Sequence, residues 1–261
     1  MIVRYVEQYP TEDHGRRGGE TERVAYRVGR GPHAPDRRDD AMADDHAGPH
    51  IELIENGPLR YRRGREGERQ GALLRPDRTE IEARENVLLC RCGASDRKPF
   101  CDNTHVGIGF TSEKKWKPGA GSMIDHVGER VTIHDNRALC AHVEYCVEDL
   151  PNVFDRSKRP WVNPDGASAE EIIALCRKCP SGALSCTVDG VLYRDYADRP
   201  PAVIATREGP YYLEGYVEVP GEPFSQGHSE EHCTLCRCGE SRNKPLCDGK
   251  HWDVGFVDRE E

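Results

Sequence analysis

The strongest constraint on this chain is a 21-residue segment that occurs twice. Residues 90–110 read CRCGASDRKPFCDNTHVGIGF and residues 236–256 read CRCGESRNKPLCDGKHWDVGF, with 12 of 21 positions identical and no gap. A Gly-Pro turn and alternating residues precede each copy, in ENGPLRYRRG from Glu55 and REGPYYLEG from Arg207, which predicts strands. A unit repeated at this level of identity indicates a duplicated structural module.

Each copy contains the pattern C-x-C-x8-C-x3-H. Cys90 and Cys92 are two residues apart, so in an extended segment their side chains point to the same side. Cys101 and His105 are four residues apart, so on one helical turn they share a face. Strand and turn together would then present four metal ligands to one point. The second copy repeats this set with Cys236, Cys238, Cys247 and His251.

The residues after the third cysteine of each copy predict a short helix. Asp102 and Asp248 follow that cysteine directly, where a carboxylate can cap the helix that carries the histidine. Asn103 and Gly249 occupy the next position, and these two residue types best tolerate a left-handed backbone. The repeat therefore indicates one backbone constraint that is met twice by different residues.

Both copies resemble the CDGSH iron–sulfur family, the mitoNEET-like proteins, whose motif is C-x-C-x2-[S/T]-x3-P-x-C-D-G-[S/A/T]-H. The first copy departs from it in Asn103 and the second in Lys250, and neither departure touches a ligand position. The resemblance implies one [2Fe–2S] cluster per copy, held by three cysteines and one histidine. The implied ligands are Cys90, Cys92, Cys101 and His105 in the first copy, and Cys236, Cys238, Cys247 and His251 in the second. A structural Cys3His zinc site is the alternative, because it uses the same ligand types.

The composition agrees with metal-stabilised modules. Val, Ile, Leu and Phe supply only 48 of 261 residues, and apolar-poor units of this kind need disulfides or metal ions. Met1–Pro10 has no basic stretch followed by an apolar run, so we expect a cytoplasmic protein whose twelve cysteines bind metal in a reducing compartment. No apolar run is long enough to cross a membrane. The net charge of −9 speaks against nucleic-acid binding.

A different cysteine pattern lies between the two copies: Cys140-x5-Cys146, followed by Cys176-x2-Cys179-Pro. Bacterial ferredoxins use C-x2-C-x2-C with a remote C-P, and here Val143 stands at the middle cysteine. The segment resembles the divergent single-cluster ferredoxin domains. The resemblance implies one [3Fe–4S] or [4Fe–4S] cluster with Cys140, Cys146 and Cys179 as ligands.

A fourth ligand for that cluster stays open among three residues: His142, Cys176 and Cys186. The alternative for Cys176 and Cys186 is that they are small buried apolar side chains, and the same holds for Cys233. One helix is predicted in this segment. Ser168 and Glu171 form a capping box before the apolar run IIALC, and short strands are expected at Arg130–His134 and Val191–Arg194.

We therefore expect an α+β chain in which two β-rich CDGSH modules flank a ferredoxin-like domain. The expected parts are a mostly disordered region at 1–50, CDGSH modules at 51–115 and 202–261, and the ferredoxin-like domain at 123–198. In mitoNEET-like proteins a dimer pairs two modules by strand exchange. With both modules in one chain, we expect an internal pair and hence a monomer.

The expected function is electron transfer, with the ligand histidines coupling it to protons, and not catalysis, since no substrate-site motif occurs. The partner would be a reductase or a terminal enzyme. The runner-up is storage, transfer or repair of iron–sulfur clusters, with an apo iron–sulfur protein as partner. A structural zinc module that mediates protein contacts is the third possibility.

Overall fold

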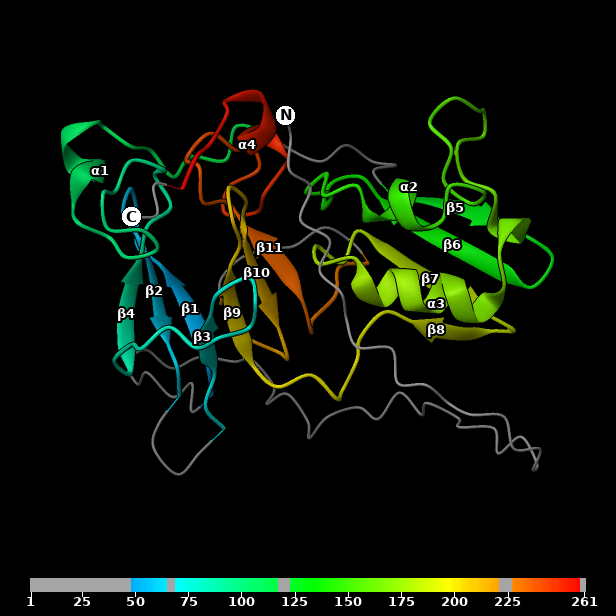
Figure 1. Ribbon diagram of the computed structural model, residues 1–261, viewed down its shortest axis with the longest axis horizontal. Helices are drawn as coiled ribbons and strands as arrows, with labels where there is room; N and C mark the ends of the chain where they lie inside the picture. The colour runs from blue at the N-terminus through cyan, green and yellow to red at the C-terminus, as the bar shows by residue number, and fades with distance from the viewer. Residues whose placement is uncertain (1–47, 65–68, 117–122, 221–226, 259–261) are drawn as a thin grey trace, which may run out of the picture. The chain divides into compact units, whose positions relative to one another are not determined.

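The computed structural model describes residues 48–64, 69–116, 123–220 and 227–258, which belong to one structural unit. Of the N-terminal region expected to be disordered, 1–47 lie outside the described residues, and His50 begins strand β1 (His50–Leu53). The described residues form three β-sheets and four short α-helices (Figure 1). This is the α+β class that the sequence predicts.

The first copy of the repeat builds an antiparallel sheet in the order β1-β2-β4. Strand β2 (Leu59–Arg62) alternates buried and half-buried residues, with Leu59 and Tyr61 facing the interior. Strand β4 (Asn86–Leu89) alternates in the same way and leads directly into Cys90. The strand expected after the Gly-Pro turn is β2. The first cysteine of the motif therefore follows directly on the last residue of the edge strand β4.

The second copy builds the corresponding sheet and receives one strand from the first copy. Its own strands are β9 (Ala202–Ala205), β10 (Tyr211–Glu214) and β11 (Cys233–Leu235). Strand β3 (Ala72–Leu74) of the first copy pairs with β9 in parallel. In return, Glu218 of the second copy pairs in parallel with His50, and the Ile51 N–H donates to the Glu218 carbonyl at 2.7 Å. Each copy thus extends the other's sheet, as expected for an internal pair.

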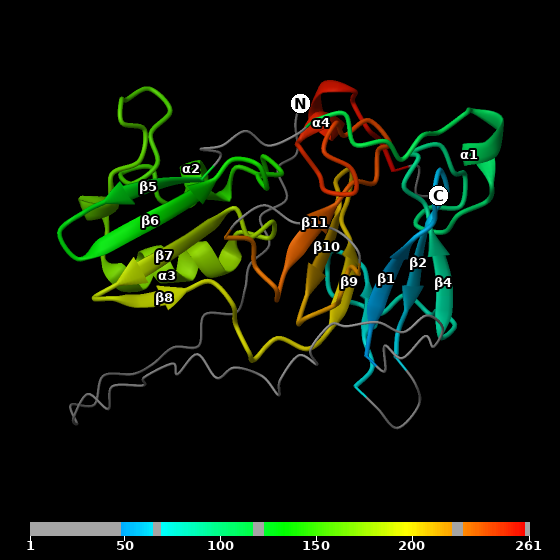
Figure 2. The ribbon, with the colours of Figure 1, turned by 180° about the vertical axis from the view of Figure 1, so that it is seen from behind.

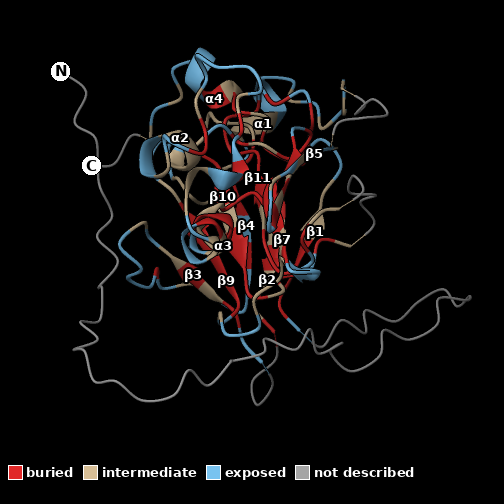
Figure 3. Ribbon diagram, turned by 90° about the vertical axis from the view of Figure 1, so that its right-hand side faces the viewer, coloured by how far each residue is buried: buried red, intermediate tan, exposed pale blue. Residues whose placement is uncertain are grey.

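The two sheets of the repeat share one apolar core. Figure 3 shows the buried strands of both copies at the centre, with exposed loops around them. The core includes Leu59, Tyr61 and Leu89 from the first copy and Val203, Tyr211, Leu213 and Leu235 from the second. Each fully buried side chain of this size stabilises the fold by about 1.5–3 kcal/mol. The two copies therefore fold as one body.

The segment between the copies forms a third, four-stranded sheet in the order β5-β6-β7-β8 (Figure 2). Its strands are β5 (Met123–Val127), β6 (Val131–Asn136), β7 (Leu184–Val188) and β8 (Val191–Tyr193). Helix α3 (Ala169–Lys178) packs on β7, and its start carries the predicted capping box: Ser168 Oγ accepts from the Glu171 N–H, and the Glu171 carboxylate accepts from the Ser168 N–H. A shorter helix, α2 (Tyr145–Asp149), and the 3-10 turn η1 (Pro164–Gly166) complete it. Within the described part of the chain, no helix is long and apolar enough to cross a bilayer.

Two four-residue helices carry the histidines of the repeat, α1 (Thr104–Gly107) and α4 (Lys250–Asp253), and lie at the same end of the two sheets (Figures 1 and 2). Both are entered through a left-handed residue, Asn103 at φ 71° and Gly249 at φ 80°, as predicted. The aspartate before that residue accepts a hydrogen bond from the first helical N–H, at 3.0 Å in the first copy and 3.2 Å in the second. The predicted carboxylate cap is confirmed in both copies.

Candidate metal centres

In the first CDGSH motif the four candidate ligands form two pairs. Cys90 and Cys92, at the end of β4, have their sulfur atoms 3.7 Å apart. On the turn into α1, Cys101 Sγ lies 3.4 Å from His105 Nδ1. The predicted proximity is confirmed for both pairs, although Cys101 lies three residues before α1 and not on its helical turn.

The second motif reproduces the two pairs. Cys236 Sγ lies 3.9 Å from Cys238 Sγ, and Cys247 Sγ lies 3.4 Å from His251 Nδ1. Two sulfur ligands of one tetrahedral metal ion, each bonded at about 2.3 Å, are about 3.8 Å apart, and a sulfur and an imidazole nitrogen are about 3.6 Å apart. Each pair therefore has the spacing of two ligands on one metal ion.

That all four ligands of a motif meet at one point stays a prediction. Among the described residues, no three His, Cys, Asp or Glu side chains are grouped as around a single ion. The reason is that residue spacing fixes each pair locally, whereas the loop from Gly93 to Phe100 sets the separation between the pairs. Each pair thus presents one tetrahedral edge, and two such pairs can hold a cluster of two metal ions.

Hydrogen bonds favour negative charge on one sulfur atom of each C-x-C pair and raise the pKa of the other, Cys92 or Cys236. Burial raises the pKa of the third cysteine of each motif. The hydrogen bond from Cys92, together with backbone N–H groups of the loop, lowers the pKa of Cys90 to about 6. In the second motif the hydrogen bond from Cys236 lowers the pKa of Cys238. The N–H groups of Asn103 and Gly249 each donate to the sulfur of the third cysteine at 3.4 Å. These donors suit thiolate ligands of an iron–sulfur cluster.

The two motifs differ in burial. Cys247 is 3 % exposed and His251 is 4 % exposed, whereas Cys101 and His105 at the matching positions are half-buried. Burial lowers the pKa of His251 to about 4, because the charged imidazolium loses its hydration there. The cysteine and histidine of the second pair are thus half-buried in the first copy and buried in the second.

The two C-x-C loops contact each other. A Cβ at Gly93 would collide with the carbonyl of Cys238, and a Cβ at Gly239 would collide with the carbonyl of Cys92. Both glycines have left-handed backbones, φ 80° and 86°. Two positions in this contact therefore require glycine for its conformation and for its missing side chain.

Gly93→Ala is expected to impair both centres, since the new methyl group must push the Cys238 backbone away. The left-handed strain alone costs about 1–2 kcal/mol, and the clash adds to it. We expect less metal at both motifs and a lower melting temperature, measured by metal analysis and a thermal melt. Gly107→Ala is the matched control, because a methyl group there meets none of the described atoms within 4 Å. Loss confined to the first motif would contradict the contact.

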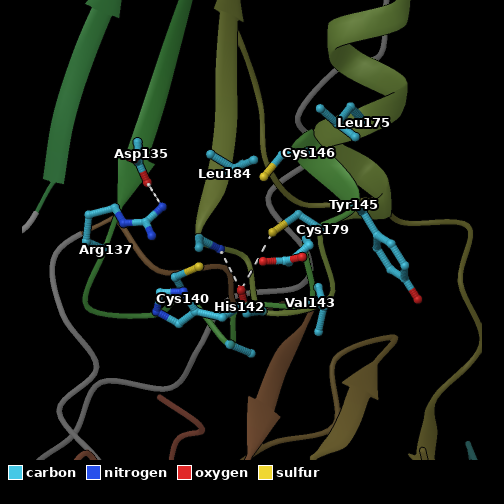
Figure 4. Close-up of a pocket in the computed structure, with 14 residues that line it drawn as sticks. Asp135, Arg137, Cys140, His142, Val143, Tyr145, Cys146, Leu175, Cys179 and Leu184 are labelled. Atoms are coloured by element: carbon cyan, nitrogen blue, oxygen red, sulfur yellow. Dashed lines mark hydrogen bonds and ion pairs between the residues drawn. The ribbon is translucent and has the colours of Figure 1, made fainter. Parts of the chain in front are cut away.

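The middle segment brings its three predicted ligands to one cavity. Cys140 lies in the loop after β6, Cys146 in α2, and Cys179 at the end of α3, and all three line this cavity. In Figure 4 their sulfur atoms are turned toward the same space. Burial and the charges of the other two cysteines raise the pKa of Cys146 to about 12. Three half-buried cysteines that line one cavity fit the ligand set of a metal cluster, because bound metal would replace their protons.

The open candidates for a fourth ligand take different positions. Val143, at the place of the missing cysteine, lines the cavity, as does His142 (Figure 4). The His142 ring, however, lies against Gly249 of the second motif. Cys176 and Cys186 lie in the apolar core of this segment, 1 % and 0 % exposed, as the apolar alternative predicts. Cys233 packs against the common core of the repeat.

Arg137 is a functional candidate that the sequence reasoning missed. It lines the cavity and its Nη1 lies 3.4 Å from Oδ1 of the buried Asp135. Burial works to lower its pKa, but the charges of Cys140 and Asp135 raise it. A fixed positive charge beside sulfur ligands favours the more negative, reduced form of a cluster. The only available signal was the position of Arg137 three residues before Cys140.

Comparisons with known proteins agree with this geometry. Residues 56–106 and 208–252 match the family described as "Iron-binding zinc finger CDGSH type", and residues 126–189 match "Divergent 4Fe-4S mono-cluster". The chain is 32% identical over 59 residues to "Uncharacterized protein YjdI" of Escherichia coli strain K12, and equally to that of strain O157:H7. Each alignment covers 23% of this chain and 78% of the relative. No solved structure matches the chain.

Iron binding and sulfur ligation therefore rest on two independent sets of family matches, and the paired cysteines and histidines lie within those matched segments. The chain belongs to the CDGSH-type iron–sulfur proteins and carries a divergent 4Fe-4S mono-cluster domain between its two CDGSH motifs.

Proposed function

We propose that the protein is an electron carrier with a [2Fe–2S] cluster at each CDGSH motif and a third cluster in the middle domain. The observation that carries this proposal is the pairing of ligands at 3.4–3.9 Å in both motifs, since two pairs hold two iron ions. When bound, each cluster takes up and gives back one electron. The residues of the proposed sites are Cys90, Cys92, Cys101 and His105; Cys236, Cys238, Cys247 and His251; and Cys140, Cys146 and Cys179.

For the middle site we propose a cluster held by three cysteines. Three thiols line the cavity and Val143 fills the place of a fourth, so a [4Fe–4S] cluster would have one iron without a cysteine ligand. Loss of that iron gives a [3Fe–4S] cluster. The side chain of Arg137 would raise the potential of either form.

Burial of the second motif favours electron transfer over cluster transfer. Cys236, Cys247 and His251 are nearly inaccessible, and the two C-x-C loops interlock, so release of a whole cluster requires the loops to open. An electron needs no such opening. A histidine that holds iron through one ring nitrogen would keep its second nitrogen to exchange a proton as the cluster gains or loses an electron, which would couple the redox state to protons.

The partner of an electron carrier is a reductase or a terminal enzyme, and we propose that the chain meets it as a monomer. The strand exchange between the two copies supports this, because one chain supplies both halves of the pair. Twelve free cysteines fit a cytoplasmic, reducing environment. Sedimentation equilibrium of the iron-loaded chain tests the monomer.

Incubation with an apo-ferredoxin separates the two candidate functions. We expect the loaded protein to titrate reversibly with a one-electron mediator and to leave the apo-ferredoxin without iron after hours. The alternative function, cluster transfer, is supported by the first motif, where Cys101 and His105 are only half-buried. Complete passage of one cluster per chain, without reversible reduction, would replace our proposal with that alternative. Metal analysis of the same samples tests a zinc module, which requires zinc without iron and sulfide.

A further inference from the structure

The second CDGSH motif contacts the middle domain through two hydrogen bonds. In each segment the two bonded residues lie on either side of a candidate ligand. Asn243 Nδ2 donates to the carbonyl of Ala138 at 2.8 Å. Trp252 Nε1 donates to the carbonyl of His142 at 3.1 Å. The two carbonyls flank Cys140 in the sequence, and the two donors flank Cys247. The loop that holds one proposed cluster is therefore bonded to the loop that holds another.

Gly249 makes the closest approach in this contact. A Cβ at this position would lie 2.7 Å from His142 Cδ2 and 3.0 Å from its Cβ. Gly249 has no side chain, and its N–H donates to the sulfur of Cys247. The His142 ring thus packs directly on the backbone that surrounds a ligand of the second site.

The first motif has none of these three features at the matching, described positions. Arg97 stands in place of Asn243 and is exposed, and Val106 stands in place of Trp252 and is 74 % exposed. Asn103 stands in place of Gly249, with the same left-handed backbone. At these three positions, therefore, only the second copy has the residues that make the contact with the middle domain. The same contact covers the second motif, which explains why its ligands are more buried than those of the first motif.

We propose that the contact between Ala138–His142 and the second CDGSH motif is an electron junction, which makes the second site the internal relay between the middle site and the first site. The second step uses the interlocked C-x-C loops, where Gly93 meets the backbone of Cys238. The half-buried first site exchanges electrons with the partner. In each step one cluster loses one electron and the next gains it, and no bond forms or breaks. This inference rests on the proposed electron-transfer function.

The relay predicts which CDGSH cluster senses the middle cluster. Magnetic interaction between paramagnetic centres falls steeply with distance, and all three clusters are paramagnetic in reduced protein. Cys101→Ala leaves only the second CDGSH site and Cys247→Ala leaves only the first. In each background, Cys146→Ser removes the middle cluster. The readout is microwave power saturation of the remaining [2Fe–2S] signal after dithionite reduction.

We expect C146S to make the second-site signal saturate at lower power and to leave the first-site signal unchanged. An equal change in both backgrounds, or no change in the second-site signal, overturns the relay. Reversible titration of the wild-type clusters is measured alongside. If it succeeds while the saturation test fails, electron transfer stands without the relay; if no cluster titrates reversibly, both are overturned.

Gly249→Asn tests the junction with every proposed ligand in place. The first motif forms the same ligand pair with Asn at this position, so the second cluster is expected to assemble. The Asn side chain must displace His142, and we expect the second-site signal in the C101A background to lose the enhanced relaxation. Asn103→Gly in the C247A background is the matched control and should change nothing. Unaltered relaxation in G249N with an intact spectrum contradicts the junction.

Discussion

Val143→Cys is expected to convert the middle site from a three-cysteine site into a four-cysteine site. Val143 lines the cavity together with Cys140, Cys146 and Cys179, so a thiol there reaches the iron that no cysteine holds. After mild oxidation with ferricyanide, the wild-type protein should show the electron paramagnetic resonance signal of an oxidised [3Fe–4S] cluster. In V143C that signal should be nearly absent, because a fourth thiolate retains the fourth iron.

The control for this substitution is Val147→Cys. Val147 lies in α2, four residues after Val143, and packs against the apolar core of the middle domain. A thiol at this position should leave the oxidised signal at its wild-type intensity. An equally strong [3Fe–4S] signal in V143C would show that another group already holds the fourth iron, with His142 as the first candidate.

In mild acid the first CDGSH site is expected to lose its iron well before the second. An ordinary imidazole takes up a proton near pH 6.5, and only the neutral ring binds metal. Burial disfavours the charged ring of His251 and lowers its pKa to about 4, so its ligating form persists as the pH falls through 6.5 and is lost only as the pH approaches 4. His105 is half-buried, so water and protons reach it directly. Visible absorbance at pH 5, followed in C101A and C247A, measures the two rates separately.

His105→Cys should slow the acid loss at the first site by about tenfold or more, because a thiolate replaces the only ligand with a titrating ring. His251→Cys should have a smaller effect over the same pH range. Equal rates at the two wild-type sites, or an unchanged rate in H105C at pH 6, would falsify the role given to the half-buried His105.

The local structure of the site could be predicted from the sequence wherever the relevant residues are neighbours in the chain. Cys101 lies beside His105, Asn103 and Gly249 take the same left-handed backbone, and Ser168 caps α3. Each of these features depends on a few consecutive residues, and spacing alone carries the information. The exchange of strands between the copies was expected from the resemblance, not from any residue pattern.

The features that the sequence left out depend on residues far apart in the chain. The hydrogen bond from Asn243 to Ala138 joins positions 105 residues apart. It belongs to the contact that covers the second motif. A signal existed, since Gly249 and Trp252 replace Asn103 and Val106 on either side of the shared histidine. Without the fold, these substitutions look like ordinary drift. Arg137 was missed for the same reason, because only the packed loop places its guanidinium beside the cysteines.

The exchange of strands between the two halves also constrains when the chain can fold. Strand β3 pairs with β9, and His50 pairs with Glu218, so the first half cannot complete its sheet until the ribosome has delivered the second half. The sheet of the middle domain has no such dependence, because its four strands pair within 123–193. During synthesis it can close first, while the N-terminal half waits with its strand edges open. Such long-range pairing slows folding and leaves a partly folded species exposed to aggregation. The order of synthesis thus lets the sheet of the middle domain form before the pairing between the two copies is complete.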